Sequence, residues 1–221
     1  MKFSGRMPGA WRPLWCLVTV LVAALGCAGE SRAFSHGPRV ELQPIDVFRR
    51  SNIQYYGGAA LGVLSFKGPA QMSAAGDEIA RIYAQELLKP GFFKDVRFFA
   101  RSAASQEEAV WLARTLECDL IMEATIQYLL DGSGSMPTHL DIAVKILDAR
   151  SGTVAWDLGQ KASSNPGKEV DLFWSVKKGA PAERYPAMAK ALAVQLVHFL
   201  AGLPPEVDTG DGGKGKGRFK W

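Results

Sequence analysis

The chain has 221 residues, of which 48% are hydrophobic and 22% are charged, with 26 basic and 22 acidic side chains. This composition excludes an intrinsically disordered chain and a bundle of membrane-spanning helices. Three of the basic residues lie within the first twelve positions, so the rest of the chain carries 23 basic (26 − 3) against 22 acidic residues. Such a near-neutral balance gives no reason to expect a nucleic-acid partner.

The first 26 residues have the pattern of an export signal. Three basic residues and no acidic residue precede an apolar stretch of 12 residues, Leu14 to Leu25, which is interrupted by Thr19. A stretch of this length is typical of a signal peptide and is too short to span a bilayer. We therefore expect residues 1–26 to be a signal peptide that directs the chain out of the cytoplasm.

Small residues lead up to Cys27, in the sequence Ala24-Leu-Gly-Cys27. This arrangement suits a lipoprotein signal peptidase, so we predict that Cys27 is acylated, for example with palmitate, and anchors the chain to a membrane. The next residue is Ala28 and not an aspartate, which favours the periplasmic face of the outer membrane. Simple cleavage of the signal after Ala33, without a lipid, is the alternative.

Composition divides the remaining chain into three parts. Residues 27–58 are predicted to be the lipidated N-terminus and a polar tether. Residues 59–202 are predicted to form one periplasmic domain of a common size. Residues 203–221 are rich in glycine and lysine, and we expect them to be a disordered tail.

The first half of the domain predicts a strand, a helix and a second strand. Ala59 to Phe66 is a short apolar run that ends in turn residues, and Val96 to Ala100 is another. Between them, Ser73 is a candidate N-cap. The apolar residues that follow it recur at helical spacing, with Glu86 expected on another face: Ile79, Ile82, Tyr83 and Leu87.

A second helix is expected from Ser105, because a serine three residues before Glu108 fits a capping box. Its apolar face is predicted to consist of Ala109, Leu112, Ala113 and Leu116. Cys118 follows shortly before a strongly apolar run, and we expect it to be a small buried hydrophobic residue without reactive function.

The second half of the domain predicts three consecutive strands and a final helix. The strands are Asp119 to Leu130, His139 to Asp148 and Thr153 to Leu158, with clear alternation in the middle one. Residues 159–180 are predicted to be irregular. Met188 to Leu200 has helical spacing. The order β-α-β-α-β-β-β-α predicts a single α/β domain with a mixed sheet of about five strands and helices packed on it.

The sequence shows no convincing catalytic site. Gly210 to Gly215 matches the dinucleotide-binding string of glycines, but this string requires a strand before it and a helix after it. No Cys-x-x-Cys or His-x-x-x-His pair is present, so no metal site is expected. We expect a protein that is not an enzyme and has no cofactor.

Two groups of residues are candidates for contact with a membrane or a partner. Phe173 and Trp174 lie in a polar stretch, and large aromatic residues there are either folded into the core or exposed for a partner or lipid. The tail combines spaced cations with aromatic residues, a pattern that suits a membrane interface or an acidic partner, although a solvated tail without a role is the alternative: Lys214, Lys216, Arg218, Phe219, Lys220 and Trp221.

The domain resembles the TolB amino-terminal-like domains of envelope lipoproteins. The resemblance rests on the strand Leu61 to Phe66, on Cys118 to Ile126, and on the hairpin that ends in Asp148-Ala-Arg-Ser-Gly-Thr-Val-Ala-Trp156. It covers about residues 60–200, and among these lipoproteins it is strongest with the lipoprotein of the Pel exopolysaccharide export system. The resemblance implies a TolB N-terminal-like fold and a non-catalytic subunit that assembles as an oligomer under the outer membrane, with Trp174 facing lipid or a neighbouring subunit.

Two functions follow as hypotheses. The first is a non-enzymatic accessory in export or assembly at the cell envelope, such as exopolysaccharide export, which acts as a homo-oligomer with other envelope proteins. The second is a monomeric periplasmic regulator of a cell-wall synthase or another assembly factor. The predicted tether of residues 28–45 spans at most about 60 Å, which is short for a regulator that must cross the periplasm.

Overall fold

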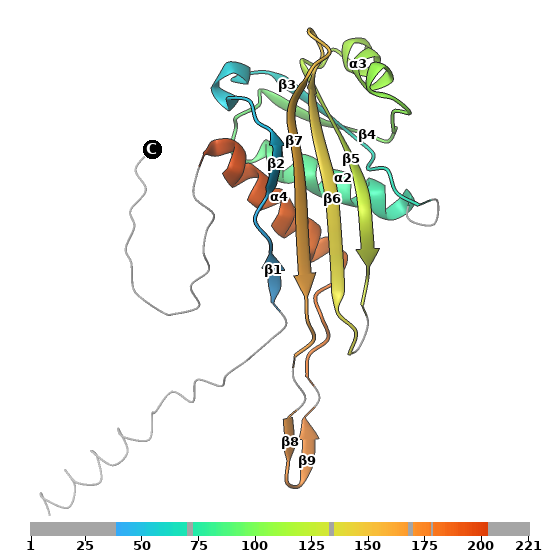
Figure 1. Cartoon of the computed structure of the whole chain (residues 1–221), viewed down its shortest axis with the longest axis vertical. Helices are drawn as coiled ribbons and strands as arrows, with labels where there is room; N and C mark the ends of the chain where they lie inside the picture. The colour runs from blue at the N-terminus through green and yellow to red at the C-terminus, as the bar shows by residue number, and fades with distance from the viewer. Residues whose placement is uncertain (1–38, 70–72, 133–134, 168–169, 178, 203–221) are drawn as a thin grey trace, which may run out of the picture. The chain divides into compact units, whose positions relative to one another are not determined.

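A mixed β-sheet forms the centre of the domain (Figure 1). The computed structural model describes residues 39–69, 73–132, 135–167, 170–177 and 179–202. The seven strands of the sheet are β1 (Val40–Leu42), β2 (Asp46–Arg49), β3 (Ala60–Leu64), β4 (Asp95–Phe99), β5 (Leu120–Leu130), β6 (Thr138–Asp148) and β7 (Val154–Ser164). The strand order is β1-β7-β6-β5-β3-β4, and β2 also pairs with β7.

The strand directions follow from the connections. The strand β3 is parallel to both β4 and β5, and helices connect these strands. The strands β5, β6 and β7 are antiparallel neighbours joined by short connections. The single α/β domain with a mixed sheet is confirmed, and the sheet has seven strands instead of about five because β1 and β2 add to β7.

Within the described residues, three α-helices pack on the sheet. They are α2 (Ser73–Leu88), α3 (Gln106–Thr115) and α4 (Tyr185–Ala201), and a short 3-10 helix, η1 (Ile53–Tyr56), precedes β3. The helices α2 and α4 contact each other and cover one face of the sheet, whereas α3 covers one end of the other face (Figure 1).

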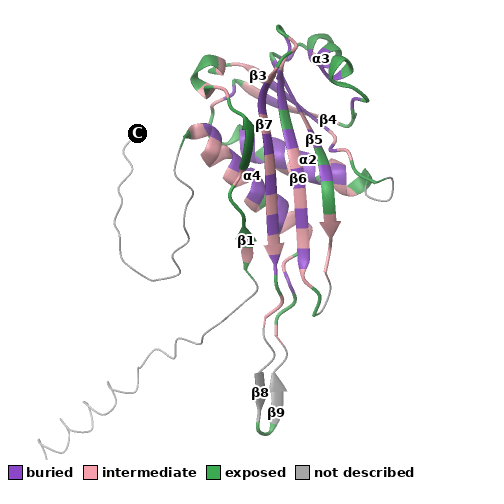
Figure 2. Ribbon diagram, in the orientation of Figure 1, coloured by how far each residue is buried: buried purple, intermediate pink, exposed green. Residues whose placement is uncertain are grey.

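The alternation of the long strands places the core. Leu140, Ile142, Val144 and Ile146 of β6 are fully buried beneath α2 and α4. Asp141 and Lys145 lie on the opposite face, as predicted. Figure 2 shows this alternation of buried and less buried residues along β6 and β7. Burial of such apolar side chains contributes about 25 cal/mol per Å² and drives the packing of both helices.

The second helix begins as predicted. Ser105 is the N-cap of α3, and its hydroxyl accepts a hydrogen bond of 3.3 Å from the N–H of Glu108. The Glu108 carboxylate accepts from the N–H of Ala104, one residue before the position that a capping box requires. Ala109, Leu112 and Ala113 are buried, as the apolar spacing indicated.

Three sequence-based expectations are corrected by the structure. The predicted tether is too long, since β1, β2 and η1 all lie within residues 40–56. Residues 159–180 are not irregular: β7 continues to Ser164, and a hairpin of β8 (Val170–Leu172) and β9 (Ser175–Lys177) follows. Glu86 is buried, because α4 and β4 both contact α2 and widen its covered face.

Candidate membrane- and partner-contact site

The tip of the hairpin between β8 and β9 presents two aromatic side chains to solvent. Phe173 is 100% exposed and Trp174 is 87% exposed. Their ring centroids lie 6.4 Å apart, with an edge-to-face angle of 71°. Leu172 pairs with Ser175, so these two aromatic residues alone form the turn. The side chains of Phe173 and Trp174 are therefore exposed and are not folded into the core.

The conformation of this two-residue turn does not call for the aromatic residues found there. Two-residue hairpin turns usually contain glycine, asparagine or aspartate, because one or both positions need a positive φ. Phe173 and Trp174 both have negative φ, since Glu117 is the one non-glycine residue with positive φ in the described ranges. A two-stranded hairpin by itself is marginally stable in water. Turn propensity therefore does not account for the two aromatic residues at the tip.

The N-terminal segment enters the sheet at the base of this hairpin. Val40 pairs with Ser164, the last residue of β7, and Glu41 and Leu42 pair with the two preceding residues. The N–H of Glu183, on the returning chain, donates to the Ser164 hydroxyl at 3.0 Å. The N–H of Gly167 donates to the Ala180 carbonyl at 2.8 Å, which pairs the two sides of the hairpin near its base. The start of β1 and the start of the hairpin thus share one end of the sheet.

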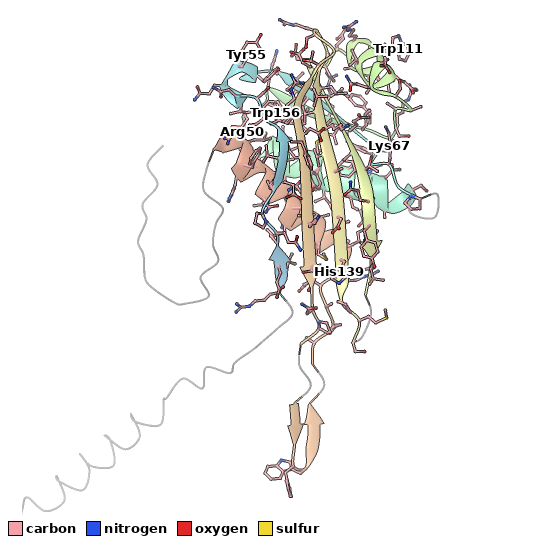
Figure 3. The ribbon with its side chains drawn as sticks, viewed as in Figure 1. Arg50, Tyr55, Lys67, Trp111, His139 and Trp156 are labelled. Carbon is pink, nitrogen blue, oxygen red and sulfur yellow. The ribbon has the colours of Figure 1, made fainter. Side chains whose placement is uncertain are left out.

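Further exposed apolar side chains lie at this end. Met136 is half exposed in the connection between β5 and β6, and Thr138 after it pairs with Ser164. Tyr128 of β5 is 52% exposed, and its ring lies 6.4 Å from that of His139. Figure 3 shows His139 at this end of the long strands, with Tyr55 and Trp111 near the other end. Sequence reasoning missed Met136 and Tyr128 as candidates, since their place at the hairpin end depends on strand register.

Polar contacts fasten the chain that returns from the hairpin. The Arg184 guanidinium lies 2.8 Å from the Asp131 carboxylate, which also accepts from the N–H of Tyr185. The Tyr185 hydroxyl donates to Glu78 of α2, and this hydrogen bond is the main cause that raises the pKa of Tyr185 to about 12. The start of α4 is thereby attached both to the connection after β5 and to α2.

The remaining candidates fall into two groups. Cys118 is buried as expected, and burial raises the pKa of its thiol. The tail candidates Lys214, Lys216, Arg218, Phe219, Lys220 and Trp221 lie outside the described residues, as does Cys27.

The described residues contain neither a metal-binding group of side chains nor a membrane-spanning helix. Within the part of the chain that the structure describes, no group of three or more histidine, cysteine, aspartate or glutamate side chains is arranged to hold a metal ion. Among the same residues, none of the helices has the length and apolar character needed to cross a membrane.

Comparison with known proteins gives matches among solved structures. Neither a family model nor a curated protein matches the sequence. The PelC dodecamer from Paraburkholderia phytofirmans is 15% identical, with a TM-score of 0.45 over 76% of this chain and 99% of that chain. Lipoprotein GNA1162 from Neisseria meningitidis is 17% identical, with a TM-score of 0.33 over 49% of this chain and 80% of that chain. The C-terminal domain of LpoB from Escherichia coli is 15% identical, with a TM-score of 0.31 over 48% of this chain and 82% of that chain. The chain is structurally similar to these proteins at low sequence identity.

Proposed function

We propose that this chain is a non-enzymatic accessory of export or assembly, anchored at the periplasmic face of the outer membrane through a lipid on Cys27. In this proposal the hairpin of β8 and β9, with Phe173 and Trp174 at its tip, holds the domain against the membrane. We call it the aromatic hairpin. The observation that carries the proposal is the pairing of Val40 with Ser164, because it brings the chain that follows the anchor to the base of the hairpin.

The lengths of the two segments are compatible with simultaneous membrane contact. Cys27 and Arg39 are 12 residues apart (39 − 27), which spans at most about 40 Å. Ser164 and Phe173 are nine residues apart (173 − 164), which spans at most about 30 Å. Because the tether is longer than one arm of the hairpin, the tip can reach the leaflet that would hold the lipid.

Burial of the two aromatic side chains in lipid would strengthen membrane attachment measurably. Full burial of a side chain as large as phenylalanine contributes about 1.5–3 kcal/mol, and tryptophan is enriched at the boundary between lipid and water. A single acyl chain gives marginal, reversible membrane binding, so a second contact strengthens the attachment. Phe173 and Trp174 would supply that contact, because both are exposed at the tip.

The resemblance of the sequence to TolB amino-terminal-like lipoproteins supports the wider role. It suggests a subunit that assembles with copies of itself and with envelope export proteins. The resemblance to the lipoprotein of the Pel system suggests exopolysaccharide export. Contact of Trp174 with lipid or with a neighbouring subunit is compatible with such an assembly.

The alternative function is a monomeric regulator that reaches a cell-wall synthase at the inner membrane. Such a regulator requires a long tether. The strands β1 and β2 occupy residues that were expected to belong to the tether, so the free length after Cys27 falls to about 40 Å. This shorter reach favours the accessory role.

Flotation with vesicles tests the membrane contact. The mature chain with Cys27→Ser, which carries no lipid, is mixed with vesicles of phosphatidylethanolamine and phosphatidylglycerol. We expect Trp174→Ser to weaken binding about tenfold, which corresponds to about 1.4 kcal/mol. Trp111→Ser is the matched control, because Trp111 is 60% exposed on α3 and should leave binding unchanged. Equal binding by the Cys27→Ser chain with and without Trp174→Ser would refute the contact.

The native mass of the lipidated chain in lipid nanodiscs tests the assembly separately. A discrete oligomer across a concentration series is the expected result. A strict monomer at every concentration would contradict the assembly and favour the regulator.

A further inference from the structure

A cavity of about 370 Å³ lies near the end of the sheet opposite the hairpin. It is open to solvent between the end of η1 and the ends of strands β3, β5 and β6. We call it the tyrosine pocket. Its lining consists of Tyr55, Tyr56, residues 57–59, Asp119, Asp148 and Arg150.

Two carboxylates are held in fixed positions in the tyrosine pocket. Oδ1 of Asp148 accepts from the N–H groups of Arg150 and Ser151, at 2.7 and 3.2 Å. Oδ2 of Asp119 accepts from the N–H of Ala60 at 3.0 Å. These bonds come from strand ends and a tight turn, so the carboxylates belong to the rigid part of the fold. They give the pocket two formal negative charges against the single positive charge of Arg150.

The one cation at the pocket is weakly held. Arg150 forms an ion pair with Asp119, in which its Nη2 atom lies 3.8 Å from Oδ1 of Asp119. The Arg150 side chain is 88% exposed. Exposed pairs of this kind contribute between 0 and about 1 kcal/mol. The position of the Arg150 guanidinium therefore shows that a cation fits beside Asp119.

Two aromatic rings complete the pocket. The rings of Tyr55 and Tyr56 are perpendicular, at 85°, with centroids 4.9 Å apart. Tyr55 is 80% exposed, so a face of its ring is free for a ligand. A lysine or arginine side chain gains about 0.5–2 kcal/mol over such a ring. Aromatic surface next to carboxylates suits a basic peptide that also carries aromatic residues.

The sequence of the chain itself contains such a peptide. Gly202, the residue after α4, lines a second cavity of about 480 Å³ together with Trp156 and residues of η1. The ring centroid of Trp156, in the second cavity, lies 5.2 Å from that of Tyr56, in the tyrosine pocket, and residues of η1 line both cavities. Residues 214–221 contain four basic residues, no acidic residue and two aromatic residues.

We propose that the basic segment of residues 214–221 docks in the tyrosine pocket of its own chain. Eleven residues, 203–213, connect Gly202 to this segment, and a chain of that length spans at most about 40 Å. Short linkers give effective concentrations in the millimolar range, so even weak contacts are well populated within one chain. The docked segment neutralises Asp119 and Asp148 and withholds its cations from other anionic partners.

This inference is independent of the proposed membrane contact, because the tyrosine pocket lies at the opposite end of the sheet from the hairpin base. The two can therefore fail separately.

Backbone NMR of the mature chain with Cys27→Ser tests the docking. Its amide shifts are compared with those of a variant in which Lys214, Lys216, Arg218 and Lys220 are all replaced by serine. We expect differences at residues 55–60, 119 and 148–150 that do not depend on protein concentration. No difference at these residues would overturn the proposal, and differences that grow with concentration would overturn docking within one chain.

A peptide with the sequence of residues 214–221 provides the second arm. It is titrated into the four-serine variant, and we expect it to restore the same shifts with millimolar affinity. Tyr55→Ala should weaken this affinity at least fivefold, while Trp111→Ala, another exposed aromatic residue near this end, should leave it unchanged. Equal affinity for the Tyr55→Ala variant, or shifts at the hairpin end, would contradict the assignment.

Discussion

The hydroxyl of Tyr83 donates a hydrogen bond of 3.0 Å to Oε1 of Gln160 in the core between α2 and β7. Nε2 of Gln160 donates to the Leu192 carbonyl and to Oε1 of Gln195, at 2.8 and 3.1 Å. Nε2 of Gln195 in turn donates to the Gln43 carbonyl at 2.7 Å. This connected set joins α2, β7 and α4 to the segment between β1 and β2, so it helps to hold the N-terminal strands on the domain.

Gln160→Leu should destabilise the domain by about 1–3 kcal/mol, because it leaves the buried Tyr83 hydroxyl without an acceptor. Burial raises the pKa of Tyr83, so the hydroxyl remains a donor at neutral pH. Urea unfolding measures the change. The double variant Tyr83→Phe/Gln160→Leu should lose less than the sum of the two single variants, because both hydrogen-bonding groups are then removed. Additive losses would show that the two side chains are not coupled.

Gln195→Ala should loosen the N-terminal strands more than the rest of the domain. The variant loses the hydrogen bond to the Gln43 carbonyl, between β1 and β2, and the one accepted from Gln160, which keeps its bond to the Leu192 carbonyl. Hydrogen exchange should become faster at amides of residues 40–49, while the free energy of unfolding falls by about 1 kcal/mol or less. Lys190→Ala, at an exposed position of the same helix, is the control. Unchanged exchange in β1 and β2 would contradict this role for Gln195.

Gly76→Ala should be strongly destabilising although alanine favours helices. A Cβ atom at Gly76 would lie 2.3 Å from the Phe66 carbonyl oxygen, so α2 would have to move away from the chain after β3. The cost of such overpacking is about 1–3 kcal/mol, and it exceeds the gain in helix propensity of about 1 kcal/mol. Thermal unfolding measures the change. Gly57→Ala is the control, because its nearest neighbour would be 3.4 Å away and its φ is negative. Equal stability of the two variants would show that the close approach at Gly76 is not constraining.

Cys118 should react slowly with iodoacetamide at pH 8. Burial is the largest cause of its raised pKa, while the nearby Arg97 guanidinium partly lowers it. A raised pKa leaves less thiolate at a given pH. Because the folded chain favours the neutral thiol, the free energy of unfolding decreases as the pH rises above the ordinary thiol pKa near 9. The alkylation rate should increase sharply in denaturing urea. Alkylation of the folded chain at the rate of a free cysteine peptide would contradict the buried, protonated thiol.

The strands with one buried face were the predictable part of the fold. β6 alternates between apolar and polar residues over its whole length, and this period is the direct result of one covered face. In β2 every residue is exposed, so no hydrophobic period marks it as a strand. The extension of β7 was also missed, because buried Gln160 and Ser164 are polar and depend on partners distant in the sequence.

The candidate site also depends on contacts between residues distant in the sequence, which the sequence pattern does not reveal. The aromatic pair Phe173 and Trp174 was visible in the sequence, but burial and exposure were both physically reasonable for it. Its relation to the proposed lipid anchor depends on the pairing of Val40 with Ser164, more than 120 residues apart (164 − 40 = 124). The tyrosine pocket likewise combines Tyr55 with Asp119 and Asp148, which the sheet brings together.

The depth of the hairpin tip in a bilayer can be measured with a nitroxide at position 173. The lipidated chain carries Phe173→Cys in a Cys118→Ala background and is reconstituted in bilayers, and its accessibility to oxygen is compared with that to a water-soluble nickel complex. We predict that the label at position 173 lies below the headgroups, while a label introduced by Tyr55→Cys, near the other end of the sheet, remains in water. A label at position 173 that is as accessible to nickel as the one at position 55 would contradict the proposal that the anchor and the aromatic hairpin hold the domain on the membrane together.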